Sequence, residues 1–180
     1  MKKQMWIIGG LVIVIVLGAY LIASNAGKEE AGNAEAPNVK KMVEDISTRK
    51  VTPESASINA TQLIVTDKGN QTTTYDLPEN EFFLSIAPYV EQTHPCAIHS
   101  LTGCQGEMEN KKFMVTIHDS EGNTLMKDAE IKSGSNGFMD FWLPRDRSYL
   151  IRMVHDGKVA ETQLSTYEED NTCITTMQLS

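Results

Sequence analysis

The sequence predicts a mainly β, α+β fold with three parts. An N-terminal membrane segment is followed by a small helix-plus-antiparallel-sheet unit and then by a C-terminal antiparallel β-sandwich. Three observations predict it. Residues 6–23 form a run without a charged side chain, and a helical apolar stripe and a hairpin signal follow it. From residue 112 onward, short β-rich segments alternate with turn residues at intervals of about ten residues.

Composition and charge limit the classes of function. The chain carries 24 acidic and 16 basic residues, a formal net charge of −8, which excludes a general nucleic-acid binder because such a protein needs a basic face. A hydrophobic content of 41% is too high for a chain disordered throughout. Three cysteines are too few for a disulfide-built miniprotein, and an odd number leaves at least one thiol without an intramolecular disulfide partner.

Residues 1–26 are predicted to be a signal peptide or a single transmembrane anchor. The apolar run 6–23 rises about 27 Å as a helix, close to the thickness of the bilayer hydrocarbon. Lys2 and Lys3 precede it and orient the N-terminus toward the cytoplasm, while Ser24-Asn25-Ala26 has the form that a signal peptidase accepts. The body is therefore expected outside the cytoplasm, in the periplasm or on the outer face of the cytoplasmic membrane. It is either secreted or held to the membrane through residues 6–23.

Residues 27–37 are small and acidic without periodicity, which predicts a flexible linker. The next part, residues 38–90, is predicted to be a small α+β N-terminal domain. Its apolar residues recur at the spacing of one helical face and predict a helix over residues 38–49; they are Val39, Met42, Val43 and Ile46.

Two β-rich segments, residues 58–66 and 71–77, follow this helix and are separated by Asp-Lys-Gly-Asn, a hairpin signal. Residues 81–87, EFFLSIA, are predicted to be a third strand of the same unit. A unit of this size is marginal alone, so we expect it to pack on the second unit or on another copy of the chain.

Residues 112–180 are predicted to form the C-terminal β-sandwich domain, which contributes Cys173. Turn residues separate its β-rich segments, as in an antiparallel sandwich or small barrel. The predicted strands are residues 113–118, 124–132, 138–143, 148–155, 158–164 and 172–179.

Residues 91–111 join the two domains and contain the least ordinary stretch, HPCAIHSLTGC, with two cysteines and two histidines. Pro95 restricts the backbone and Gly103 permits unusual angles, so this loop is able to aim several side chains at one point. If residues 172–179 are a strand, Cys173 and Met177 share one face, and a loop crossing that end of the sheet can approach Cys173.

The residue types favour copper. Thiolates are soft donors that prefer cuprous ion, whereas imidazole suits both copper and zinc. Zinc is the less favoured metal, because the seven residues between Cys96 and Cys104 depart from the C-x2-4-C spacing of structural zinc sites. Cuprous ion accepts two or three ligands, so three thiolates, or two thiolates and an imidazole, are sufficient.

HPCAIHSLTGCQGE is preceded by LPENEFFLSIAPYVEQT and followed far downstream by NTCITTMQLS. With these motifs, the chain resembles the CueP family of periplasmic copper-binding proteins over most of its body. The resemblance implies that Cys96, Cys104 and Cys173 are copper thiolates, and it matches His94 and His99 to the histidines that flank the first cysteine. It also implies copper resistance, delivery of copper to an exported cuproenzyme such as a Cu,Zn superoxide dismutase, and a homodimer through the N-terminal domain.

Other interpretations of these residues remain open. In one of them, a Cys96–Cys104 disulfide leaves Cys173 as an inert buried thiol, and the protein is a structural or interaction module. His94 is also interpretable as a solvated loop residue. An extracytoplasmic thiol-disulfide exchange protein is the best enzymatic alternative, although C-x-x-C is absent. Electrons leaving the thiols are able to reduce cupric to cuprous ion. Without a G-x-S-x-G, H-E-x-x-H or phosphate-loop motif, the chain is expected to be a metal-binding protein rather than an enzyme.

Overall fold

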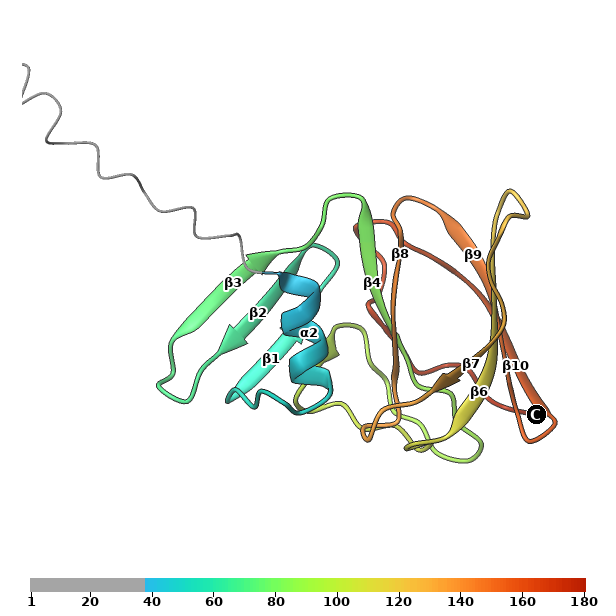
Figure 1. Cartoon of the computed structure of the whole chain (residues 1–180), viewed down its shortest axis with the longest axis horizontal. Helices are drawn as coiled ribbons and strands as arrows, with labels where there is room; N and C mark the ends of the chain where they lie inside the picture. Colours follow the sequence, from blue (N-terminus) through green and yellow to red (C-terminus); the bar gives the residue numbers. More distant parts are fainter. Residues whose placement is uncertain (1–37) are drawn as a thin grey trace, which may run out of the picture. The chain divides into compact units, whose positions relative to one another are not determined.

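A computed structural model describes residues 38–180. The predicted signal peptide or anchor (1–26) and linker (27–37) lie outside the described residues. Within the described part, no helix is long and apolar enough to cross a membrane. Residues 38–180 form one short helix and three β-sheets, so the mainly β, antiparallel prediction is confirmed for this part of the chain (Figure 1).

Helix α2 (Val39–Ser47) confirms the predicted helix. The side chain of Asn38 accepts a hydrogen bond from the backbone N–H of Lys41 and so caps the first turn. Three apolar side chains of the helix are buried and pack on the neighbouring sheet; they are Val39, Val43 and Ile46. The amphipathic stripe therefore holds the helix in place.

The sheet beneath the helix is antiparallel and has the order β3-β2-β1-β5. Its strands are β1 (Ser55–Ile58), β2 (Gln62–Thr66), β3 (Thr72–Asp76) and β5 (His99–Ser100). The predicted hairpin is confirmed between β2 and β3, where the Asp67 side chain accepts from the N–H groups of Gly69 and Gln71. The single strand expected over residues 58–66 is wrong. A turn separates β1 from β2, because the Asn59 side chain accepts from the N–H groups of Thr61 and Gln62.

Strand β4 (Glu81–Ile86) forms as predicted but lies in a different sheet from the hairpin. It pairs antiparallel with β8 (Met139–Pro144) and parallel with β11 (Cys173–Ile174). Both faces of β4 are buried: Phe82 and Leu84 enter the sandwich core, whereas Phe83 joins the core beneath α2. An unbroken apolar run such as EFFLSI is typical of a strand covered on both sides. The expected packing of the small unit on the second one is thereby confirmed.

The remaining sheet is antiparallel with the order β10-β9-β6-β7. Its strands are β6 (Lys112–Asp119), β7 (Thr124–Lys132), β9 (Ser148–His155) and β10 (Lys158–Ser165). Side chains of β6 and β9 share one apolar core with those of β4 and β8, so the two sheets pack face to face. The sandwich therefore needs β4, which precedes the cysteine and histidine loop in the sequence.

The strand predicted over residues 172–179 is shorter than expected. Only β11 and an isolated bridge between Tyr89 and Gln178 form there. The predicted alternation is nevertheless present, because Cys173 and Met177 are buried while Thr176 is exposed. Cys173 thus faces inward beside β4.

Candidate metal centre

Strand pairing brings the two distant parts of the site together. Within the loop of residues 91–111, β5 pairs with β1, which fixes His99 beside Ile58. On the other side, β11 pairs with β4 and sets Cys173 beside Ser85. The Thr172 hydroxyl links the two, since it accepts from the His99 N–H at 3.1 Å and donates to the Ile58 carbonyl at 2.6 Å. The C-terminal segment is therefore fastened to the loop and to β1 by hydrogen bonds between a side-chain hydroxyl and backbone groups, independently of any metal.

The three cysteines lie together in this structure. Cys96 and Cys173 form a disulfide across a sequence separation of 77 residues, with a Cα–Cα distance of 5.5 Å. Cys104 is a free thiol whose Sγ lies 3.5 Å from Sγ of Cys96. The alternative of a Cys96–Cys104 disulfide with an inert Cys173 is wrong. The register of β11 on β4 presents Cys173 to Cys96, a contact that sequence spacing cannot reveal.

The five residues singled out in the sequence fall into two overlapping clusters. The first comprises His94, Cys96 and Cys104, and the second comprises His99, Cys104 and Cys173. Within each cluster the possible ligand atoms lie within 4.8 Å of one another. Cys104 belongs to both clusters, so its thiol lies where a soft cation could contact either group.

The His99 ring is fully buried. It lies between two aromatic rings, with its centroid 4.6 Å from that of Phe138 and 6.1 Å from that of Phe83. Burial lowers the pKa of His99 to about 4, and the nearby Asp140 carboxylate opposes this shift only in part. At neutral pH His99 is therefore the uncharged imidazole, which is the form that binds a metal.

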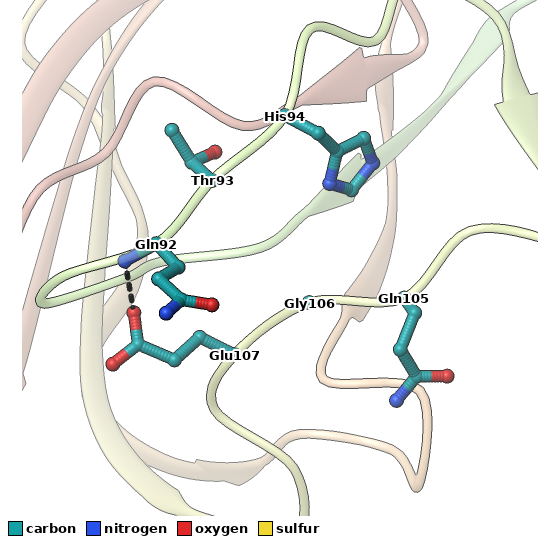
Figure 2. Close-up of a pocket in the computed structure, with 6 residues that line it drawn as sticks. All are labelled: Gln92, Thr93, His94, Gln105, Gly106 and Glu107. Atoms are coloured by element: carbon teal, nitrogen blue, oxygen red, sulfur yellow. Dashed lines mark hydrogen bonds between the residues drawn. The ribbon is translucent and has the colours of Figure 1, made fainter.

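His94 has a more open environment. It is partly buried and lines a surface pocket of about 260 Å³ together with residues on both sides of the loop (Figure 2). The pocket residues are Gln92, Thr93, His94, Gln105, Gly106 and Glu107. The first cluster is thus the one nearer to solvent, because all three of its residues are partly exposed, and His94 connects it to the pocket.

Glu107 fastens the two ends of the loop to each other, a role that no pattern in the sequence predicts. One of its carboxylate oxygens accepts from the backbone N–H groups of Val90, Glu91 and Gln92, at 3.1, 2.9 and 2.8 Å. Figure 2 shows the bond from Gln92. These bonds favour the ionised form and lower the pKa of Glu107. The segment that leads into His94 is therefore tied to the segment that follows Cys104.

Ser85 and Asp140 also lie at this site, although the sequence did not predict a role for either residue. Ser85 is fully buried on β4, and its hydroxyl lies 2.6 Å from Oδ1 of Asp140 and 3.3 Å from Nε2 of His99. A polar residue inside the apolar run EFFLSIA was the available signal, because a buried hydroxyl requires a hydrogen-bond partner.

Comparison with known proteins identifies the family. The family model described as "Periplasmic copper-binding protein CueP" matches residues 38–178. The chain belongs to the CueP family. The crystal structure of S.CueP is 39% identical to this chain, with a TM-score of 0.74, and the alignment covers 88% of this chain and 97% of that one. No curated protein matches the sequence significantly. The periplasmic location of the CueP family agrees with the predicted extracytoplasmic location of the body.

Proposed function

We propose that this CueP protein holds cuprous ion through the thiolates of Cys96, Cys104 and Cys173, with His99 or His94 as a nitrogen ligand. Thiolate sulfur and imidazole nitrogen are donors that suit cuprous ion. The observation that carries the proposal is the position of Cys104, whose thiol belongs to both ligand clusters. Zinc remains the less favoured metal.

The disulfide couples copper binding to redox state. Two electrons and two protons convert the Cys96–Cys173 disulfide into two thiols, which lose their protons when they bind a metal. In the opposite direction, two cupric ions accept one electron each from the two thiols and give two cuprous ions, one disulfide and two protons. The protein is therefore expected to reduce cupric ion stoichiometrically rather than catalytically, and each such event removes two of the three thiolates.

The biological role that we propose is copper tolerance in the cell envelope. It includes delivery of copper to an exported cuproenzyme, for which a Cu,Zn superoxide dismutase is the expected recipient. Homodimerisation through residues 38–90 and attachment to the membrane through residues 6–23 belong to the same proposal.

Titration with cuprous ion against a competing chelator tests the proposal. The fully reduced protein is expected to bind one ion tightly, whereas Cys96→Ser, Cys104→Ser and Cys173→Ser should each bind much more weakly. His118→Gln is a suitable control, because His118 lies at the end of β6 and outside both clusters. Equal binding by the wild type and all three cysteine variants would exclude a three-thiolate site.

Thiol-disulfide exchange is a second candidate function, and one observation favours it. The free thiol of Cys104 lies 3.5 Å from Sγ of Cys96, a disulfide sulfur, where its thiolate is able to attack. Such an attack would form a Cys96–Cys104 bond and release Cys173 as a thiolate. Cys173→Ser removes that leaving group but keeps Cys96 and Cys104, which are close enough to cycle as a pair. Catalytic reduction of a model disulfide that survives Cys173→Ser would therefore favour this function over a three-thiolate copper site.

A further inference from the structure

The hydrogen bonds around His99 determine which of its ring nitrogens carries the hydrogen. The Ser85 hydroxyl has one proton, and it donates this proton to Oδ1 of Asp140 at 2.6 Å. Oγ of Ser85 then has only lone pairs to offer to Nε2 of His99 at 3.3 Å. Nε2 must therefore be the nitrogen that bears the hydrogen, and in a neutral imidazole this leaves Nδ1 with a free lone pair.

Nδ1 of His99 has no hydrogen-bond partner in the described structure, although the residue is fully buried. A buried polar atom without a hydrogen-bond partner destabilises the fold, so its presence calls for an explanation. Cys104 and Cys173 supply the nearby donor atoms, within 4.8 Å of a ring nitrogen of His99. Because Nε2 is hydrogen-bonded to Ser85, Nδ1 is the nitrogen that remains to bind an ion together with the cysteine sulfurs.

The sheet register places these groups together. Ser85 on β4 is paired with Cys173 on β11 and with Asp140 on β8, so the three residues form one row across the three-stranded sheet. Side chains at paired positions point to the same face of a sheet. The sulfur of Cys173 and the hydrogen-bonded pair Ser85 and Asp140 therefore lie on the same face of the sheet, which is the face that contacts His99.

We propose that Ser85 and Asp140 are positioning residues that hold the hydrogen of His99 on Nε2 and thereby reserve Nδ1 as a copper ligand. The aromatic rings of Phe83 and Phe138 restrict the plane of the imidazole, but they do not distinguish its two nitrogens. The hydroxyl and carboxylate supply that distinction. Partners of this kind typically change metal affinity 10- to 100-fold when they are removed. The inference rests on the proposed copper site.

The first test reads the tautomer of the imidazole without any metal. In the full-length protein with its disulfide intact, two-bond ¹H–¹⁵N NMR spectra should show His99 with the hydrogen on Nε2. Ser85→Ala is expected to change this pattern toward a mixture of tautomers, whereas Ser85→Thr, which keeps a hydroxyl, should preserve it. Asp140→Ala is the second variant, at an exposed position that should tolerate substitution, and it is expected to give a mixture as well.

The second test measures cuprous affinity in the reduced protein by chelator competition. Ser85→Ala and Asp140→Ala should bind about 10- to 100-fold more weakly than the wild type. In a His99→Ala background, Ser85→Ala should add no further loss. Asp76→Asn, an exposed carboxylate variant on β3, is the matched control and should leave affinity unchanged.

The outcomes separate the two proposals. Tight binding by the wild type and by Ser85→Ala alike, with the hydrogen on Nδ1 in the metal-free ring, would overturn only the positioning role. Absence of cuprous binding by the reduced wild type would overturn the copper site and this inference together. A purely structural role for Ser85 would lower the melting temperature without changing the tautomer or the affinity, and that result would also overturn the inference.

Discussion

Reduction of the Cys96–Cys173 disulfide in the absence of metal should destabilise the fold by about 4.5 kcal/mol. The two cysteines are 77 residues apart, and a loop of that length confines the unfolded chain strongly. The loop-closure relation gives an entropy of about 15 cal/mol/K, which corresponds to about 4.5 kcal/mol at 25 °C. For a domain of this size, the melting temperature should fall by roughly 9–18 °C.

Urea denaturation of three states of the protein measures this effect: oxidised, reduced, and reduced with one equivalent of cuprous ion. The reduced state should unfold at the lowest urea concentration. Copper should restore the stability, because it joins the same segments and binds only the folded state. Cys104→Ser, which keeps the disulfide, is the control and should match the oxidised wild type.

The result that would refute this reasoning is a loss of less than about 1 kcal/mol upon reduction, well below the typical contribution of a native disulfide. It would mean that the hydrogen bonds of Thr172 to His99 and Ile58 hold the two segments together without help. The double variant Cys96→Ser/Cys173→Ser provides the same comparison without a reductant.

Acid should destabilise the protein through His99, because its folded pKa of about 4 lies below the ordinary value of 6.5 and the unfolded chain takes up the proton first. The free energy of unfolding should fall by at most about 3 kcal/mol from pH 6.5 to pH 4 in urea titrations, and His99→Phe should flatten this slope. Glu107 has a lowered pKa, so its contribution is present above its ordinary value of 4.5 and is lost at lower pH. Glu107→Gln should therefore reduce the calorimetric melting temperature at pH 7 but not at pH 3, and an equal reduction at both would contradict the interpretation. Phe83→Ala should cost about 3–5 kcal/mol in equilibrium denaturation, because the ring is fully buried beneath α2; a loss near zero would exclude this packing.

Local patterns in the sequence predicted the local structure well. The stripe of α2 and the strands β6 to β10 depend on residue periodicity and on turn residues between neighbours, which can be read directly. The boundary between β1 and β2 was missed because it depends on one side chain, that of Asn59, which binds backbone N–H groups within an apparently continuous β segment.

Relations between distant segments could be predicted only in part. The motif around Cys96 and Cys104 indicated the candidate metal centre and the family, but the disulfide partner depends on the register of β11 against β4. The contact of Ser85 with His99 and Asp140 likewise requires three strands from separate parts of the chain to meet. No periodicity encodes such contacts, because each strand pattern is satisfied by several pairings.

Strand β4 contributes side chains to both apolar cores, with Phe82 on one side and Phe83 on the other. If either core unfolded alone, the side chains on one face of this strand would become exposed to water. The free-energy cost would be comparable to that of exposing several buried apolar side chains. Calorimetry should accordingly record a single cooperative unfolding transition for residues 38–180. A soft cation bound beside β4 would therefore raise the melting temperature of the helix and of the sandwich together.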